Sequence, residues 1–260
     1  MALPLLSSLA GLVGVEPSTC GVMLLSMTRC KHEKIIRKEV WCLTHAKVDM
    51  FHFDFLMKLK AFGEPKGTIG VLIEDHFDMT EYRLFNKRLP AAGYNVEYIS
   101  NLWNNSSLQF GSNPDNGWVE EHLDVSMDVA NVDPALYKGF LLIGAYATDR
   151  LRYTVKPEKG KPNDAPAVEL LRRICATTGV KVGTICHSLW LFCADPLLIK
   201  GKKVTCAHNI ICDLENAGAD VQYGDEGTIG SVIDGDLISA KHPAFTDELI
   251  DIFIQEIEKA

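Results

Sequence analysis

A cysteine and a histidine directly follow an apolar run in Gly183-Thr-Ile-Cys186-His187-Ser188. Val180–Ile185 is typical of a buried strand, and a short helix is predicted to begin at Ser188. Such a sharp turn exposes the side chain at its apex, and the helix after it supplies amide donors and a positive dipole end. We therefore expect Cys186 to be a reactive thiolate with a lowered pKa. Judged by residue type alone, a cysteine at a strand end is more often a small buried core residue.

A second strand-to-helix turn is rich in titratable side chains. Five of them fall within eight residues, namely Glu74, Asp75, His76, Asp78 and Glu81. Acids are favoured in the first turn of a helix, so solvated helix-start acids explain most of them. Ligands of open α/β sheets bind beyond the carboxyl ends of the strands, so both turns are candidate parts of a site. A zinc site that combines this turn with His208 lacks a typical ligand spacing, and no metal is predicted.

The elements that position these turns alternate along the chain. Short apolar runs predict strands at 68–73, 95–100, 140–143, 180–185, 203–206, 231–233 and 237–239. Helical spacing predicts helices at 79–89, 165–178, 188–194, 210–217 and 244–259. Residues 101–131 are expected to form a small hairpin plus a loop, and 153–164 a surface loop. The fold class is α/β: a flavodoxin-like, doubly wound, mostly parallel sheet with helices on both faces.

Charge divides the chain into two parts. The 260 residues are 47% hydrophobic and 23% charged, which excludes a disordered, collagen-like or coiled-coil protein. Residues 1–62 carry eight bases and five acids, a net +3, whereas the rest carries 18 bases and 29 acids, a net −11. An acidic main body excludes a generic basic nucleic-acid-binding surface and favours small molecules or protein partners. We assign residues 1–65 to an N-terminal extension and 66–260 to one domain.

The cysteines and the N-terminal extension give information on the cellular compartment. Eight cysteines occur without a CxxC spacing, so we expect reduced thiols in an intracellular protein. No run of 18 apolar residues predicts a membrane span. The N-terminal extension is poor in acidic residues at its start and rich in basic residues after that. This composition is compatible with an organelle transit peptide, although a loosely packed extension is the simpler interpretation. A cytoplasmic location is predicted, with a mitochondrion or plastid as the alternative.

Four segments carry a resemblance to a known family. They are Val182–His187, Ala194–Thr205, Asn216–Ala219 and Val132–Tyr137. With them, Lys66 to Glu258 resembles the ThiJ/PfpI family of the class I glutamine amidotransferase-like superfamily. The resemblance implies the same α/β fold and places Cys186 at the position of the family nucleophile.

The resemblance also implies partners for that thiol. The family has a glutamate beside the thiol, and Asp78 is the matching residue, with Glu81 one helical turn later as the fallback. A protonated carboxyl there would donate a hydrogen bond to the thiolate or act as a proton shuttle. His187 matches the histidine of the protease-like subgroup. Its partner carboxylate comes from an adjacent subunit in that subgroup and corresponds to Asp149, so the site would be completed only in a homo-oligomer.

Two loops depart from the family pattern. The family usually has a Pro-Gly-Gly turn whose amides form an oxyanion hole, and this chain has Gly144-Ala145-Tyr146 after Ile143. Ala145 keeps its N–H, so Gly144, Ala145 and His187 are expected to hold an oxyanion, while Tyr146 crowds the site. His208 stands where a proline or a small residue is frequent. These departures bear on substrate specificity rather than on the fold.

The resulting functional hypothesis is a cysteine-dependent hydrolase or lyase that acts on electrophilic carbonyls. Similar proteins act on peptides, on α-oxoaldehydes such as methylglyoxal, or on their early adducts with amines. No cofactor, nucleic acid or membrane partner is expected. The alternative is a redox-sensing or chaperone-like stress protein in which Cys186 is oxidised to a sulfinate stabilised by Asp78. A glutamine amidotransferase is disfavoured, because Ala244 replaces the glutamate of the late His-Pro-Glu motif, and His242 is interpreted as a surface residue.

Overall fold

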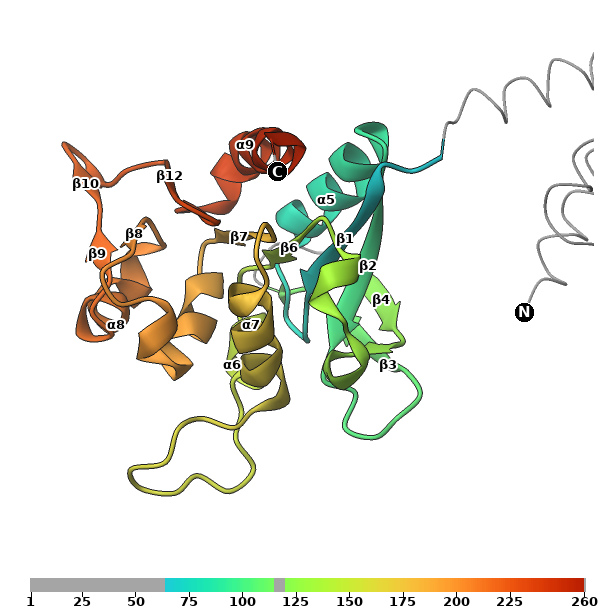
Figure 1. Ribbon diagram of the computed structural model, residues 1–260, viewed down its shortest axis with the longest axis horizontal. Helices are drawn as coiled ribbons and strands as arrows, with labels where there is room; N and C mark the ends of the chain where they lie inside the picture. Colours follow the sequence, from blue (N-terminus) through green and yellow to red (C-terminus); the bar gives the residue numbers. More distant parts are fainter. Residues whose placement is uncertain (1–63, 115–119, 260) are drawn as a thin grey trace, which may run out of the picture. The chain divides into compact units, whose positions relative to one another are not determined.

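The structure is a computed structural model that describes residues 64–114 and 120–259. Its centre is a seven-stranded sheet in the order β12-β13-β7-β6-β1-β2-β5 (Figure 1). In that order the strands are β12 (Ser231–Asp234), β13 (Leu237–Ala240), β7 (Lys181–Ile185), β6 (Gly139–Leu142), β1 (Gly67–Leu72), β2 (Tyr94–Ser100) and β5 (Met127–Asp128). All neighbours are parallel except β12 and β13. The predicted doubly wound, mostly parallel α/β fold is therefore confirmed.

Helices cover both faces of this sheet. They are α5 (Met79–Ala91), α6 (Ala147–Leu151), α7 (Pro166–Ala176), α8 (Ile211–Asn216) and α9 (Thr246–Lys259). Successive residues of β1 point to opposite faces, so Val71 belongs to one buried cluster and Leu72 to the other. The Val71 cluster contains the apolar faces of α5 and α9, including Phe85 and Phe253. The Leu72 cluster contains those of α7 and α8, including Leu171.

The β1-α5-β2 unit agrees closely with the pattern in the sequence. Gly67–Leu72 is buried along most of its length, as expected for a strand covered on both faces. Asp78 caps α5 by accepting a hydrogen bond from the amide of Glu81 (3.0 Å). Pro90 lies inside the last turn of α5, and Gly93 (φ 92°) makes the left-handed turn into β2.

The segment between β2 and β6 forms the expected hairpin. Strands β3 (Leu108–Gly111) and β4 (His122–Val125) pair antiparallel in a sheet of their own. The chain then adds β5 to the edge of the central sheet and makes two short 3₁₀ turns, η2 (Val129–Asn131) and η3 (Pro134–Leu136). The edge strand β5 has only two residues, too few for its pattern to be read from the sequence.

The elements after β7 differ in detail from the prediction. The helix that follows Cys186 is a 3₁₀-helix, η4 (Ser188–Ala194). The strand predicted at 203–206 is shorter, and it pairs outside the central sheet. The remaining small elements are η5 (Pro196–Leu198), β8 (Lys203–Val204) paired with β9 (Asp220–Val221), η6 (His208–Ile210), β10 (Tyr223–Gly224) paired with β11 (Gly227–Thr228), and η7 (Pro243–Phe245). The β12-β13 hairpin at Asp234-Gly235 forms as predicted.

Two sequence-based predictions concern residues 1–65. Nearly all of this extension lies outside the described residues, so the transit-peptide and loose-extension hypotheses both remain predictions, as does the compartment. No helix in the described part of the chain is long and apolar enough to cross a membrane.

Candidate active site

A cavity of about 310 Å³ lies at the carboxyl ends of four neighbouring strands, β1, β6, β7 and β13. Its wall consists of Asp78, Thr80, Asn113, Ala145, Tyr146, Cys186, His187, His242 and Pro243. The strand ends meet there because the strands are parallel and adjacent. The two turns selected from the sequence therefore belong to one site.

Cys186 lies at the apex of the sharp turn between β7 and η4, the elbow, and its backbone is strained there. Its φ is 57°, a left-handed value that is uncommon for a residue other than glycine. Two hydrogen bonds hold the turn: the amide of Cys186 donates to the carbonyl oxygen of Ala240 on β13 (2.9 Å), and the amide of Ile185 donates to Ser188 Oγ (2.7 Å). Strain that the surroundings maintain in this way is typical of functional sites.

Glu81 lies directly across Gly144 from Cys186. A Cβ added to Gly144 would lie 2.8 Å from Glu81 Oε1 and 2.9 Å from Cys186 Cβ, so glycine is needed for this close approach. The amide of Gly144 donates to Glu81 Oε2 (2.6 Å), and Oε1 has no hydrogen-bond partner among the described residues. Burial raises the pKa of Glu81 well above its usual value, and the nearby charge of Asp78 adds to the effect. The surroundings of Glu81 therefore favour the protonated, neutral form of its carboxyl group.

Asp78 is at the same site but is held differently. Its carboxylate caps α5 through the amide of Glu81 while the residue also lines the cavity. Asp78 and Glu81 both influence the pKa of Cys186, and Glu81 has the larger effect. The acid that approaches the thiol through Gly144 is thus the fallback candidate, Glu81, and Asp78 forms part of the cavity wall.

The thiol itself is not the low-pKa group that the turn suggested. Burial raises the pKa of Cys186 to about 12, and a negative charge on Glu81 acts in the same direction. Hydrogen bonds from the amides of Ala145 and His187 to the sulfur act against it. Protonation of Glu81 removes the charge that opposes ionisation of the thiol. Burial thus favours the neutral forms of both the Cys186 thiol and the Glu81 carboxyl group.

Two backbone amides form a candidate oxyanion hole. Those of Ala145 and His187 already face the sulfur, and Ala145 has a left-handed φ of 56° that turns its amide toward the elbow. The expected third donor, Gly144, does not take part, because its N–H is used by Glu81. Ala145 is held in place by an isolated β-bridge with Phe77, in the turn that precedes α5.

His187 is surrounded by the remaining predicted residues. Burial lowers its pKa, and hydrogen bonds with Asn209 and with the backbone of Ala145 act against this. The ring of Tyr146 meets it edge to face, with 5.9 Å between the ring centroids. The exposed residues Asp149 and His208 influence the pKa of His187 in opposite directions, so both lie near it. Asp149 of the same chain thus acts electrostatically on His187, and its role as a carboxylate supplied by a neighbouring subunit stays a prediction.

Four residues of the cavity wall were not singled out from the sequence as site residues. They are Thr80, Asn113, His242 and Pro243. Asn113 and Thr80 carried no signal, because nothing in a single sequence distinguishes them from other polar residues. His242 did carry one: it closely follows the apolar strand β13, and its place beside the elbow depends on β13 pairing with β7.

Glu74 belongs to the same strand-to-helix turn as Asp78, but it stabilises the fold and does not line the cavity. It is 1% exposed, its Oε1 lies 3.2 Å from Arg150 Nε, and its Oε2 accepts a hydrogen bond from Ser100 Oγ (3.2 Å). Burial raises the pKa of Glu74, and Arg150 partly offsets this. The acidic residues between β1 and α5 thus have different roles. Glu74 links the end of β1 to β2 and α6, whereas Asp78 and Glu81 lie at the site.

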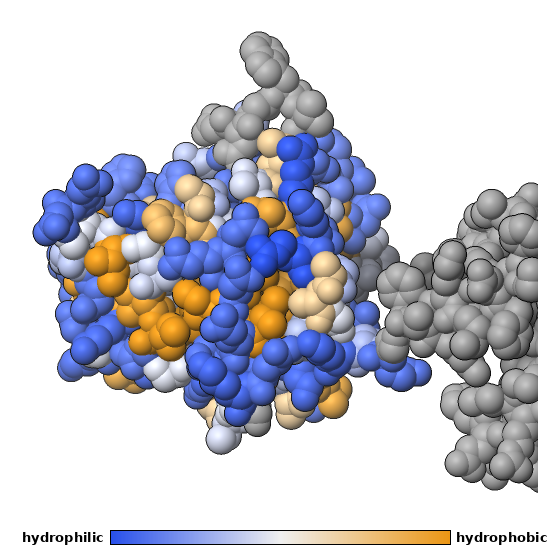
Figure 2. All heavy atoms as spheres, turned by 90° about the horizontal axis from the view of Figure 1, so that it is seen from above, coloured by the Kyte–Doolittle hydropathy of each residue, from blue (hydrophilic) through white to orange (hydrophobic). Residues whose placement is uncertain are grey.

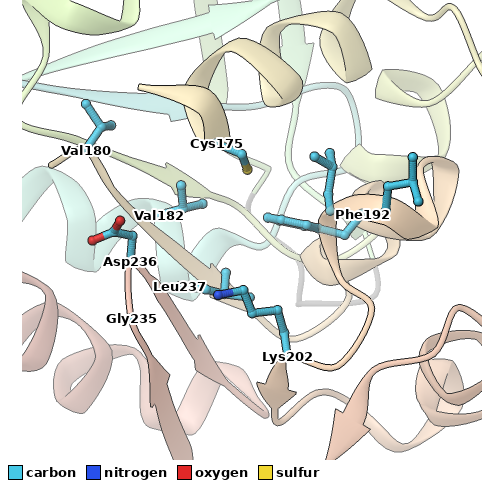
Figure 3. A pocket seen from close by; sticks show the side chains of 10 residues that line it. Cys175, Val180, Val182, Phe192, Lys202, Gly235, Asp236 and Leu237 are labelled. Atoms are coloured by element: carbon cyan, nitrogen blue, oxygen red, sulfur yellow. The ribbon is translucent and has the colours of Figure 1, made fainter. Parts of the chain in front are cut away.

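A second cavity, of about 330 Å³, lies at the opposite end of β7 (Figure 3). Cys175, Phe192 and Leu237 point into it, and none of the predicted site residues lines it. Apolar residues also gather in the middle of the face shown in Figure 2, framed by hydrophilic ones. Within the described ranges no group of three His, Cys, Asp or Glu side chains could hold a metal ion.

Comparisons with known proteins identify relatives of this chain in two staphylococci. An uncharacterised protein of Staphylococcus aureus is 26% identical over 191 residues, which are 74% of this chain and 96% of that protein. An uncharacterised protein of Staphylococcus epidermidis is 24% identical over 190 residues, 73% of this chain and 97% of that protein.

Solved structures show the same fold. A ThiJ/PfpI domain protein from Brachyspira murdochii superposes with a TM-score of 0.59 at 14% identity, over 76% of this chain and 99% of that one. DJ-1beta of Drosophila melanogaster gives 0.57 at 16% identity, over 74% and 94%. The profile of the DJ-1/PfpI family matches residues 68–256. The chain therefore belongs to the DJ-1/PfpI family.

Proposed function

We propose that this protein is a cysteine-dependent hydrolase or lyase of the ThiJ/PfpI type that acts on electrophilic carbonyls. The observation that supports the proposal most is the position of Cys186. It stands at a strained elbow on the wall of a cavity, with the buried carboxyl group of Glu81 across Gly144 and two backbone amides directed at its sulfur. A purely structural cysteine requires none of these features.

The first chemical step joins the sulfur to the carbonyl carbon. The C=O π electrons move to the oxygen, where the amides of Ala145 and His187 stabilise the charge. The thiol proton leaves for His187 or Asp78, which both line the cavity. Burial lowers the pKa of His187, so its imidazole is neutral at pH 7 and able to accept a proton. Glu81 donates a hydrogen bond to the thiolate as it forms. With an aldehyde, return of the proton to the oxygen completes a thiohemiacetal.

The charge of the cavity wall narrows the substrate class. Among the described residues that line it, Asp78 is an acid and none is a lysine or arginine. A carboxylate or phosphate group on the substrate would meet Asp78 without a cation to balance it. Neutral α-oxoaldehydes, and adducts that bear an amine, are the substrates that such a wall favours.

Turnover by purified variants tests this function. We expect the full-length wild type to consume methylglyoxal or to cleave a peptide, and Cys186→Ser to lose this activity. Cys212→Ser is the matched control, because Cys212 is exposed on α8 and is not part of the cavity wall. If the wild type shows no turnover but gains two oxygens at Cys186 after mild peroxide, the enzyme proposal is wrong and a redox sensor is favoured.

Homo-oligomerisation is a separate part of the proposal. The resemblance supplies the carboxylate of Asp149 to His187 from an adjacent subunit, so a homo-oligomer would complete the site. Sizing by light scattering at the assay concentration measures the oligomeric state. A monomer with full activity would contradict a site completed between subunits.

A further inference from the structure

We propose that His242 is a substrate-binding residue of the Cys186 site: its Nε2–H donates a hydrogen bond to the carbonyl oxygen of the substrate. This inference rests on the function proposed above, because it concerns the same cavity. Its support is independent of that chemistry and comes from three observations: strand register, the cavity wall and a backbone cap.

Strand register brings His242 beside the elbow. Strands β7 and β13 are parallel neighbours, and Ile185 is paired with Ala240. Cys186 is one residue beyond Ile185, and His242 is two residues beyond Ala240. Both strands therefore end at the same edge of the sheet, and both residues line the cavity.

A backbone cap determines which ring atom of His242 can donate. The amide of Ala244 donates to His242 Nδ1 (3.3 Å) at the start of η7, where Pro243 occupies the first turn. An accepting Nδ1 carries no proton, so the neutral ring holds its hydrogen on Nε2. The donor of the ring is thus the nitrogen that the cap leaves unused, and Nδ1 is not available as a base.

The role complements those of the other donors. The amides of Ala145 and His187 face the sulfur, so they stabilise charge close to the new S–C bond. His242 reaches the cavity from the β13 side and can fix the direction in which the carbonyl oxygen points. A substrate oxygen held from two sides presents its carbon to Cys186 in one orientation.

Alkylation of Cys186 by two reagents tests this inference without any turnover. Iodoacetamide carries a carbonyl oxygen that His242 could bind, whereas iodomethane carries none. The variant His242→Asn keeps a side-chain acceptor for the Ala244 amide, but its shorter amide group places no N–H at the position of the ring Nε2. We expect it to slow labelling by iodoacetamide about 5-fold, the value of one hydrogen bond, and labelling by iodomethane less than 2-fold. Labelling at Cys186 is followed by peptide mass spectrometry at one fixed pH.

Two further variants make the result specific. His242→Gln restores an N–H at similar reach and is expected to recover most of the iodoacetamide rate. His122→Asn, at an exposed histidine on β4 away from the cavity, is expected to change neither rate. Equal slowing by both reagents in His242→Asn, or no slowing by either, would overturn the proposal. Failure of the proposed function is seen separately, as absence of turnover by the wild type.

Discussion

Replacement of Gly144 by alanine tests the contact between Glu81 and Cys186. The new Cβ would lie 2.8 Å from Glu81 Oε1 and 2.9 Å from Cys186 Cβ, whereas ordinary van der Waals contact begins at 3.4 Å. Neither neighbour can easily withdraw, since Glu81 is fully buried and Cys186 is fixed at the elbow. Overpacking of this kind costs about 1–3 kcal/mol.

Thermal unfolding measures the cost. The described domain falls in the size range in which 1 kcal/mol shifts Tm by about 2–4 °C, so Gly144→Ala should lower Tm by about 2–12 °C. Gly224→Ala is the control, because its Cβ would meet only the side chain of Ile229 at 3.1 Å and the oxygen of Gly227 at 4.0 Å. We expect the control to change stability by no more than about 0.5 kcal/mol.

A double-mutant cycle locates the clash. In a Glu81→Ala background the carboxylate oxygen is gone, so Gly144→Ala should cost about 1 kcal/mol less than in the wild type. The placement of Glu81 beside Gly144 would be refuted by an unchanged Tm of Gly144→Ala, or by costs that simply add in the double mutant.

Two other predictions concern pH. The pKa of Glu81 is raised in the folded state, so its contribution to stability is fully present below pH 4.5 and is lost as the pH rises through the folded pKa. Glu81→Gln cannot ionise, so its Tm should gain on that of the wild type from pH 4 to pH 9; parallel curves would contradict a buried carboxyl group. Arg150→Ala removes the partner of buried Glu74, whose pKa is also raised in the folded state. In urea unfolding, the variant should match the stability of the wild type near pH 4 and be about 1–2 kcal/mol less stable at pH 8. The loss is modest because Arg150 is largely exposed. Arg83→Ala, at a more exposed pair with Glu121, is the control, and an equal loss there would argue against a special role for Arg150.

The sheet and the elbow could be predicted from the sequence because their signals are local. A short β-branched run that ends in Cys186-His187 and passes directly into a helix specifies both the strand and the turn. The three-residue spacing of Asp78 and Glu81 could not show which acid reaches the thiol. A signal was present nevertheless: Glu81, Phe85 and Leu89 recur every fourth residue, which places Glu81 on the buried face of α5.

Other features depend on contacts that a single sequence does not reveal. His242 belongs to the site because β13 pairs with β7 in the sheet. These two strands are far apart in the sequence. The pKa of Cys186 was expected to fall because of the helix that follows. That helix is a 3₁₀-helix, and burial of the thiol outweighs the amides that face it. The balance between burial and donors can be judged only when the surrounding side chains are placed.

The hydrogen bond between the Cys186 amide and the Ala240 carbonyl also bears on synthesis. A ribosome makes the elbow long before it makes β13, which supplies this acceptor, and His242, which closes one wall of the cavity. A nascent chain that has passed Cys186 thus still lacks the strand that fixes the thiol in its strained turn. The nucleophile is assembled only when the last strand docks, so incomplete chains do not present the finished reactive site.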